Sequence, residues 1–322
     1  MPSVTRAFVL GAGLGKRLRP LTERRPKPLV PLYHKPLITF AFDHLISCGI
    51  ESFAVNTHHC PEAYHVHLGE NGGKALYRGH PVSFRHEPVL LDTGGGIKNV
   101  EDLIGNHPFV VYNGDVLADF PLAPLIESHL AGGNIATLAL RSHGGPLHIQ
   151  CDTKSGLISD IRGTLGRQAD PSFLFTGISV LSPEIFQHIP GGEIISIIPV
   201  YLEILKQRGK IGGVVVDGGL WFDLGTRESY LDAHRLLAPG GYQLSHAEPG
   251  WPSPVHGSST VHPAASLEGI CAVGPGAVVG AGAKVKDSVL WENSTVESSA
   301  EIDRCIVRDG SCATGQIYST DL

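Results

Sequence analysis

The sequence predicts an α/β domain built on a mostly parallel sheet flanked by helices, followed by a small domain of stacked coils. Two observations predict this. Up to about residue 238, hydrophobic runs typical of strands alternate with runs typical of helices, a rhythm that favours parallel strands joined by helical crossovers. Beyond residue 257, an aliphatic residue recurs at every sixth position, which is the period of a repeat protein.

The alternation places each element of the first domain. We expect strands near 6–10, 52–56, 82–86, 108–113 and 135–140, and helices near 37–48, 61–68, 97–104 and 122–131. Ligands of such sheets collect at the carboxyl ends of the strands. The loop at Gly11, the turn Asn113-Gly114-Asp115 and the turn Thr93-Gly94-Gly95-Gly96 should therefore line one crevice.

Between residues 239 and 257 the composition shifts to Pro, Gly, Ser and His without periodicity, which indicates a linker. The predicted domains are thus 1–238 and 258–322. The second has aliphatic residues six apart, the first four of them followed by a small residue four positions later, with a one-residue slip before Leu290. These positions are Val261, Leu267, Val273, Val279, Val285, Leu290, Val296 and Ile302, with Ala265, Cys271, Ala277 and Ala283. The pattern resembles the left-handed parallel β-helix of hexapeptide-repeat proteins, in which aliphatic side chains fill triangular coils.

Charge and composition narrow the class of ligand. The 322-residue chain carries a formal charge of -6, yet six basic residues and one acid lie between 16 and 27. A positive patch on an acidic protein favours a small anion over nucleic acid. Met1-Pro2-Ser3 leads directly into a predicted strand and no apolar run approaches membrane length, so we expect no signal peptide and no membrane segment. Six scattered cysteines without a Cys-x-x-Cys pair favour a reducing cytoplasm over disulfides or zinc.

A predicted strand, Arg6–Leu10, runs into a loop with glycines at alternate positions, Gly11, Gly13 and Gly15. Such glycines let backbone amides approach a polyphosphate. Two commoner glycine loops do not fit. A Walker A loop needs glycine where Leu10 stands and a hydroxyl residue after the lysine, and a dinucleotide fingerprint needs a third glycine where Lys16 stands.

The stretch Gly11-Ala12-Gly13-x-Gly15-x-Arg17-Leu18-x-Pro20-Leu21-Thr22, followed by Pro26-Lys27-Pro28-Leu29-Val30-Pro31, resembles the sugar-1-phosphate nucleotidyltransferases. The resemblance implies a Rossmann-like catalytic domain that joins a nucleoside triphosphate to a sugar 1-phosphate and releases pyrophosphate. It implies that Arg17 holds the departing phosphates and that Lys27 neutralises the reacting ones. The nucleotide would contact Leu10, Gly11, Ala12, Gly13, Gly15 and Lys16. The family usually has alanine at Gly11, a difference expected to leave backbone contacts intact.

Two aspartates are candidates for a metal site. Asp115 follows the hydrophobic run Phe109–Tyr112, and Asp223 lies in a Trp-x-Asp-x-Gly-Thr segment that resembles the metal-binding segment of the family. The resemblance implies that both bind a divalent ion, Mg²⁺, which bridges the α-phosphate and the sugar phosphate. Because the sugar phosphate is already an anion near neutral pH, no general base is required, and catalysis reduces to alignment and charge neutralisation.

Substrate choice stays open at this point. Glu87 can accept two neighbouring hydrogen bonds, a pattern that guanine offers, and Thr93, Gly94 and Asn113 are assigned to the nucleotide by resemblance. The Asp92–Ile97 segment is similar to N-acetylmuramate-1-phosphate uridylyltransferases, whereas the repeat domain resembles mannose-1-phosphate guanylyltransferase-like members. Gly177 resembles the position that passes under the hexose. Candidate acids for the sugar hydroxyls are Asp152, Asp160 and Asp170.

The favoured activity is that of a mannose-1-phosphate guanylyltransferase; the alternatives are uridylyl or thymidylyl transfer to N-acetylmuramate or a hexose, and a non-catalytic paralogue that binds nucleotide sugars. Retention of Arg17, Lys27, Asp115 and Asp223 opposes the last. An acyltransferase in the repeat domain is a further alternative, although about three coils form a short acyl-CoA groove. A zinc site at His58, His59, His65 and His67 is disfavoured by their spacing. Exposed β-helix flanks commonly pair with another subunit, so a homo-oligomer through this domain is one of the oligomeric states that the sequence leaves open.

Overall fold

The computed structural model describes residues 3–71, 74–167 and 171–322. The chain divides into two compact units. One comprises Met1–Leu14 and Ile38–Asp223, and the other comprises Gly15–Leu37 and Leu224–Leu322. The second part of the glycine loop therefore belongs to the same unit as the C-terminal coils. The segment 239–257 lies inside that unit, and the domain boundaries proposed from the sequence stay a prediction.

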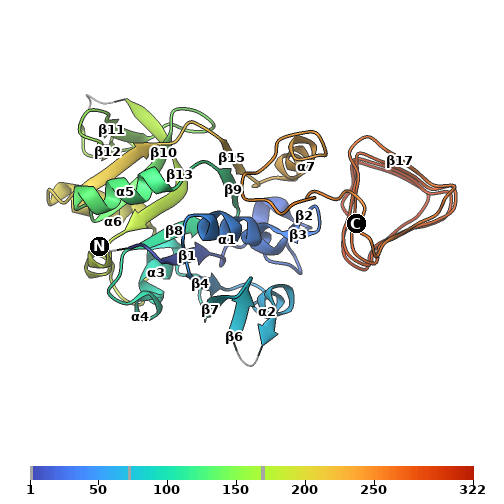
Figure 1. The fold of residues 1–322 in the computed structure, drawn as a ribbon, viewed down its shortest axis with the longest axis horizontal. Coiled ribbons are helices and arrows are strands. Elements are labelled where there is room, and N and C mark those ends of the chain that lie inside the picture. The colour runs from blue at the N-terminus through green and yellow to red at the C-terminus, as the bar shows by residue number, and fades with distance from the viewer. Residues whose placement is uncertain (1–2, 72–73, 168–170) are drawn as a thin grey trace. The chain divides into compact units, whose positions relative to one another are not determined.

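The first unit is built on a mixed sheet whose strand order is β10-β14-β12-β11-β13-β8-β1-β4-β7-β6-β5 (Figure 1). Four central strands run parallel: β8 (Phe109–Asn113), β1 (Arg6–Leu10), β4 (Ser52–Thr57) and β7 (His80–His86). The outer strands are β10 (Ala136–Arg141), β14 (Ile211–Val215), β12 (Leu157–Ile161), β11 (Ile149–Asp152), β13 (Ser172–Leu181), β6 (Lys74–Tyr77) and β5 (Glu70–Asn71). The antiparallel pairing of β13 with both β8 and β10 makes the sheet mixed.

Helices cover both faces of this sheet (Figure 1). They are α1 (Leu37–Ser47), α2 (Glu62–Leu68), α3 (Asp92–Asn99), α4 (Glu101–Ile104), α5 (Ala123–Gly132) and α6 (Ile197–Lys206). Helices α3, α4 and α6 share a buried cluster with Phe8, Val111 and Leu138. Helices α1 and α5 lie on the other face of the sheet. His44 of α1 contacts Tyr112 and His129 of α5 contacts Thr137, and these strand residues adjoin Val111 and Leu138, whose side chains point to the first face.

The predicted fold class is confirmed, and the elements expected in the first domain are present. One element differs. Residues Thr93–Gly96, predicted as a turn, form the first part of α3, which begins at Asp92 rather than near residue 97. Three consecutive glycines argue against a helix by propensity. They are tolerated here because the helix packs very closely: a Cβ at Gly95 would stand 2.5 Å from the Glu193 carbonyl oxygen.

The second unit begins with short turns and ends in coils. It contains η1 (Lys16–Leu18), η2 (Lys27–Leu29), β2 (Pro31–Leu32), β3 (Lys35–Pro36), α7 (Arg227–Leu236) and the strands of the coils. The coil strands are β16 (Thr260–Val261), β17 (Ser266–Glu268), β18 (Ala272–Val273), β19 (Val278–Val279), β20 (Lys284–Lys286), β21 (Val289–Leu290), β22 (Thr295–Val296), β23 (Glu301–Asp303), β24 (Ile306–Val307), β25 (Cys312–Ala313) and β26 (Gln316–Tyr318). Helix α7 starts at a capping box, in which the Thr226 hydroxyl accepts the Ser229 N–H and the Ser229 hydroxyl accepts the Thr226 N–H.

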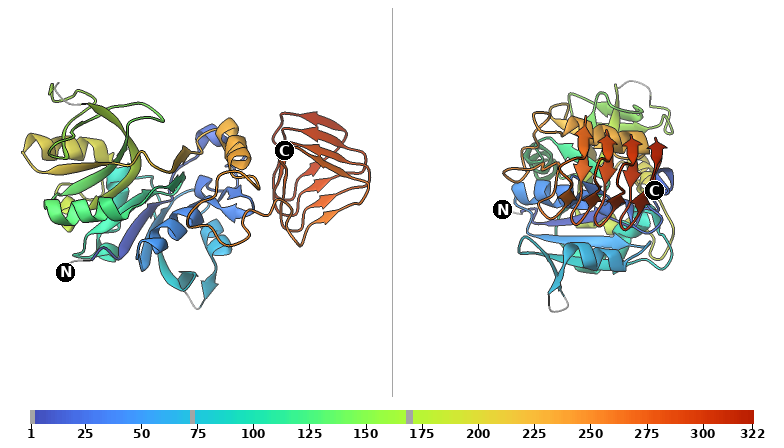
Figure 2. Two further views of the ribbon diagram at one scale, coloured as in Figure 1. Left: turned by 45° about the horizontal axis from the view of Figure 1, so that its top comes forward. Right: turned by 90° about the vertical axis from the view of Figure 1, so that its right-hand side faces the viewer.

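The coils form a parallel β-helix with three sheets, and Figure 2 shows the strands of successive coils running in one direction. Val261 pairs with Val279 and Val279 with Val296, so one coil takes 18 residues and the next 17. The predicted slip is the single residue lost between Val285 and Leu290. The aliphatic and small residues of the repeat meet in one core, as their spacing predicts.

Among the described residues, no helix is both long and apolar enough to cross a membrane.

Candidate active site

The end of β1 meets the end of β8 at the carboxyl edge of the central strands. Leu10 pairs in register with Asn56 on one side and Asn113 on the other. The Gly114 N–H donates to the Leu10 carbonyl oxygen at 3.0 Å. A Cβ at Gly114 would stand 2.7 Å from that oxygen, so the turn that delivers Asp115 needs a glycine to pass this close to β1.

The first residues of the glycine loop are held by side chains rather than left open. Asn56 Oδ1 accepts the N–H groups of Gly11 and Ala12 at 2.8 and 3.3 Å, and the Tyr64 hydroxyl donates to the Gly11 carbonyl at 2.7 Å. A Cβ at Gly11 would stand 2.6 Å from the Asn56 carbonyl oxygen. The alanine usual in the family would thus require the strands to shift here. Gly13, by contrast, is exposed, with nothing near the position of a Cβ.

Glu87 is fully buried behind this loop. Its Oε1 accepts from Asn56 Nδ2 at 2.8 Å and its Oε2 accepts from the Leu91 N–H at 3.0 Å. The carboxylate therefore orients the Asn56 amide, whose oxygen in turn holds Gly11 and Ala12. This arrangement favours a supporting role for Glu87 over direct contact with a nucleobase.

The glycines of α3 serve close packing. A Cβ at Gly94 would meet the Ile195 carbonyl oxygen at 2.8 Å, and one at Gly96 would meet Asn56 Nδ2 at 2.9 Å. Thr93 Oγ1 accepts the Ile197 N–H at 2.9 Å and so joins α3 to the first turn of α6. Thr93 and Gly94 thus lie at a helix start that is fastened to α6.

Asp115 and Asp223 lie on a two-stranded ribbon separate from the main sheet. Strands β9 (Val116–Asp119) and β15 (Leu220–Asp223) pair antiparallel, with Asp223 opposite Val116. Asp115 directly precedes Val116, so the two aspartates occupy neighbouring positions at one end of the ribbon. Burial, and then the charge of Asp115, raise the pKa of the Tyr64 phenol far above its usual value, which places Asp115 near the residue that holds Gly11.

This pair of carboxylates fits Mg²⁺. Mg²⁺ is usually bound by one or two carboxylates and completes its shell with substrate phosphates and water. Among the described residues no group of three or more His, Cys, Asp or Glu side chains is placed to hold a metal ion. The donor set suits an ion that arrives with a phosphate ligand.

Gly177 lies in a bulge of β13 where the register against β10 shifts. Its φ is +81°, and a Cβ would stand 2.4 Å from Asn113 Nδ2. The glycine therefore makes room for the Asn113 side chain beside the turn that carries Asp115. The adjacent Thr176 carbonyl accepts the Trp221 indole N–H at 2.9 Å, which ties the bulge to the strand carrying Asp223.

The remaining predicted residues lie in the second unit. Gly15 adopts φ +58°, and a Cβ there would stand 2.9 Å from the Thr22 methyl carbon. Lys16 is exposed, whereas Lys27 is only 5% exposed, and its side chain shares a small apolar cavity with Leu18 and Tyr230. The wrapped aliphatic stem limits the positions that the Lys27 ammonium can reach.

The Arg17 guanidinium lies against a glycine of the Trp-x-Asp-x-Gly-Thr segment. A Cβ at Gly225 would stand 2.7 Å from Arg17 Nη2 and 2.9 Å from its central guanidinium carbon. An alanine at this position would require the guanidinium, the end of a flexible and exposed side chain, to move away. The segment thus contains the Asp223 carboxylate and, two residues later, the glycine that lies against Arg17.

Comparison with known proteins decides the family. The model of the nucleotidyl transferase family matches residues 6–146. Mannose-1-phosphate guanylyltransferase from Mycobacterium tuberculosis is 32% identical over 92% of this chain and 83% of its own length. The chain belongs to the sugar-1-phosphate nucleotidyltransferase family.

Two other similar proteins define how far the likeness extends. An N-acetylmuramate alpha-1-phosphate uridylyltransferase from Neisseria meningitidis is 30% identical over 69% of this nucleotidyltransferase and 93% of its own length. The solved structure of a UDP-glucose pyrophosphorylase from Acinetobacter baumanii covers 72% of the chain with a TM-score of 0.61 at 19% identity. The match also covers 92% of the solved chain. This similarity shows that the two proteins share a fold.

Sequence reasoning missed three residues of this nucleotidyltransferase site: Asn56, Tyr64 and Gly225. Asn56 and Tyr64 act through contacts between distant segments, which no local motif records. Gly225 was visible within its segment, but its partner was not. Arg25, counted among the basic loop residues, pairs instead with Glu292 of the coils.

The candidate acids for the sugar have other partners. Asp160 is buried and accepts the N–H groups of Ile161, Leu165 and Arg167, so it stabilises a turn. Asp152 is engaged by the Ser155 hydroxyl at 2.7 Å, and Asp170 lies outside the described residues. The acid that meets the sugar hydroxyls stays unassigned.

Proposed function

We propose that this nucleotidyltransferase is a mannose-1-phosphate guanylyltransferase, which converts GTP and mannose 1-phosphate into GDP-mannose and pyrophosphate. The observation that carries the proposal is the extent of the likeness to the Mycobacterium tuberculosis protein of that name. A match over 92% of the chain must include most of the β-helix, whereas the uridylyltransferase match spans 69%.

The reaction is an in-line displacement. A phosphate oxygen of the sugar 1-phosphate attacks the α-phosphorus and forms a new P–O bond, while the bond to the bridging oxygen of the β-phosphate breaks. Pyrophosphate leaves with that electron pair. Because the nucleophile is already ionised, the protein has to align the two phosphates and neutralise their charge.

Each predicted residue has a role in that task. Arg17 and the backbone amides at Gly13 and Gly15 would stabilise the departing pyrophosphate, and Lys27 would screen the approaching anion. Asp115 and Asp223 would hold Mg²⁺. An Mg²⁺ ion held there would supply positive charge to the reacting phosphates.

The residues around the base are proposed to act at two levels. Leu10, Thr93, Gly94 and Asn113 would border the nucleotide, while Glu87 would orient the Asn56 amide and thereby the N–H groups of Gly11 and Ala12. Gly177 would border the sugar. The hydrogen bonds of Glu87 and the contact of Gly177 with Asn113 support these positions.

A matrix of nucleotides and sugar phosphates tests the proposal. GTP, UTP, dTTP, CTP and ATP are each combined with the 1-phosphates of mannose, glucose, N-acetylglucosamine and N-acetylmuramate, and pyrophosphate release is measured. We expect the highest kcat/KM with GTP and mannose 1-phosphate. Release with no pair would favour a non-catalytic paralogue and overturn the proposal.

A second candidate, an N-acetylmuramate-1-phosphate uridylyltransferase, is supported by the Asp92–Ile97 segment. That segment resembles N-acetylmuramate-1-phosphate uridylyltransferases, one of which is matched over 93% of its length. The same matrix separates the two candidates, because UTP with N-acetylmuramate 1-phosphate would then give the highest kcat/KM.

Two properties of the whole molecule are proposed with the activity. All six cysteines are free, which supports a reducing cytoplasmic setting. A homo-oligomer formed through the β-helix is proposed from the resemblance, and light scattering of the purified protein tests it.

A further inference from the structure

The loop that carries Arg17 and Lys27 is fastened to the β-helix within the second unit. Arg25 is the first fastening point. Its guanidinium lies 4.9 Å from the centre of the Trp291 ring and bonds both carboxylate oxygens of Glu292. Its side chain is 8% exposed. A planar guanidinium held by a ring and a two-pronged carboxylate has little freedom.

The second fastening runs through α7. The Trp291 indole N–H donates to the Tyr230 hydroxyl at 3.0 Å, and that hydroxyl donates to the Pro31 carbonyl oxygen. Both aromatic side chains are buried. One hydroxyl thus connects a coil of the β-helix to the loop just past Lys27.

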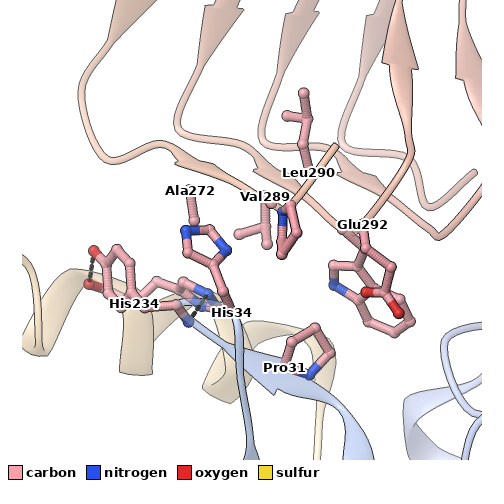
Figure 3. Close-up of a pocket in the computed structure, with 11 residues that line it drawn as sticks. Pro31, His34, His234, Ala272, Val289, Leu290 and Glu292 are labelled. Atoms are coloured by element: carbon pink, nitrogen blue, oxygen red, sulfur yellow. Dashed lines mark hydrogen bonds between the residues drawn. The ribbon is translucent and has the colours of Figure 1, made fainter. Parts of the chain in front are cut away.

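Figure 3 shows how these elements converge around a pocket, with Pro31 and His34 from the loop, His234 from α7, and Ala272, Val289, Leu290 and Glu292 from the coils. The Tyr33 hydroxyl donates to the His234 carbonyl at 2.8 Å. Loop, helix and coils therefore pack as one assembly around Pro31.

The third fastening is Arg308. Its Nη1 donates to the Pro20 carbonyl at 3.0 Å and lies 3.3 Å from Glu23 Oε2. Pro20, Glu23 and Arg25 all lie between Arg17 and Lys27 in the sequence. Pro20 is only three positions from Arg17, and Arg25 is only two positions from Lys27. The coils therefore hold the backbone next to both cations.

We propose that Trp291, Glu292 and Arg308 of the β-helix are positioning residues for nucleotidyl transfer, because they hold the loop whose cations meet the phosphates. The inference rests on the roles proposed above for Arg17 and Lys27. Charge stabilisation in a transition state depends on donors already in place, and a misplacement of about 1 Å can cost on the order of 10²-fold in rate. The β-helix would then be part of the catalytic apparatus.

Two substitutions test this with little change in shape. Glu292→Gln removes the charge facing Arg25, and Trp291→Phe removes the N–H that reaches Tyr230 while it keeps an aromatic ring. We expect each to lower kcat about tenfold and to raise the inhibition constant of pyrophosphate, while the KM of the sugar 1-phosphate stays within about twofold. If these residues only stabilised the fold, the substitutions would lower the melting temperature without changing kcat and the pyrophosphate inhibition constant selectively.

Glu301→Gln is the matched control. Glu301 pairs with Lys284 on the outer surface of the same β-helix at 2.6 Å, away from the fastening points, and its loss should leave both kinetic constants unchanged. Wild-type kcat in Trp291→Phe and Glu292→Gln would overturn the inference. If Glu292→Gln does not fold, Trp291→Phe and Arg308→Gln decide the same question.

Arg17→Ala and Lys27→Ala, assayed alongside, separate this inference from the proposed function. Inactive cation variants with fully active β-helix variants would overturn only the positioning role. Fully active cation variants would overturn the roles on which it rests.

Discussion

Arg17 lies so close to Gly225 that a Cβ at Gly225 would stand 2.7 Å from Arg17 Nη2. Gly225 follows Asp223 by two residues. The same short segment therefore contains one proposed ligand of Mg²⁺ and the backbone against which the cation proposed to receive the leaving pyrophosphate lies.

Gly225→Ala should displace the Arg17 guanidinium and lower kcat by on the order of 10-fold or more, because the donor would no longer be preorganised. The KM of the sugar 1-phosphate should change little. Pyrophosphate release under saturating substrates measures the effect. Gly218→Ala is the control, since a Cβ there meets nothing within 4 Å, and equal activities of the two variants would contradict the assignment.

Lys27→Ala and Asp115→Asn should each reduce turnover by about 10²-fold or more while the protein stays folded, because each removes one charge from the reacting phosphates. Circular dichroism and the melting temperature report the fold. Raising the Mg²⁺ concentration should partly restore Asp115→Asn but not Lys27→Ala. Full activity in either variant would refute its proposed role.

Asn56→Ala should raise the KM of the nucleoside triphosphate and lower the free energy of unfolding by about 2–6 kcal/mol. It leaves the Gly11 N–H and the Glu87 carboxylate without their side-chain partner in a buried site, and such losses cost about 1–3 kcal/mol each. Steady-state kinetics and urea denaturation measure the two effects.

Glu87→Gln should show a smaller loss of the same kind, because its amide oxygen can keep only one of the two acceptor positions. Glu51→Gln, at an exposed side chain, is the control. If Glu87 instead meets the base directly, its substitution would change the preference among nucleotides rather than the free energy of unfolding.

Sequence patterns predict the elements of this protein where one physical requirement dominates. The strands Arg6–Leu10 and Phe109–Asn113 are apolar at their central positions on both sides, Ala7–Val9 and Val110–Tyr112, because both faces of the sheet are covered by helices. The β-helix repeats because every coil must bury the same kind of side chain, and even the lost residue before Leu290 is visible as a change of period. These features depend on local periodicity alone.

The remainder depends on contacts between distant segments. The glycines of Thr93–Gly96 predicted a turn because helix propensity disfavours them, whereas close packing against Glu193 and Ile195 makes them helical. Likewise, the sequence shows Arg25 only as one of six basic residues in a positive patch. Only the coil that brings Trp291 and Glu292 to it shows that it fastens the loop.

Two buried histidines should make the protein less stable in mild acid. Burial lowers the pKa of His129 and of His234 to about 4 from the usual 6.5. Between those values the unfolded chain binds more protons than the folded one, so the free energy of unfolding falls as pH falls from about 6.5 to 4, and each histidine contributes up to about 3 kcal/mol. Above pH 6.5 both rings are neutral in the folded and the unfolded chain, so this loss of stability is absent.

His129→Gln should flatten this dependence, because glutamine does not titrate and can still face Thr137 and Ser182, the present partners of the ring nitrogens at 3.0 and 3.1 Å. Urea denaturation from pH 7.5 to 4.5 measures the slope. The exposed His107 is the control, since its substitution should leave the slope unchanged. An unaltered slope in His129→Gln would mean that the ring is already charged in the folded protein or that water reaches it.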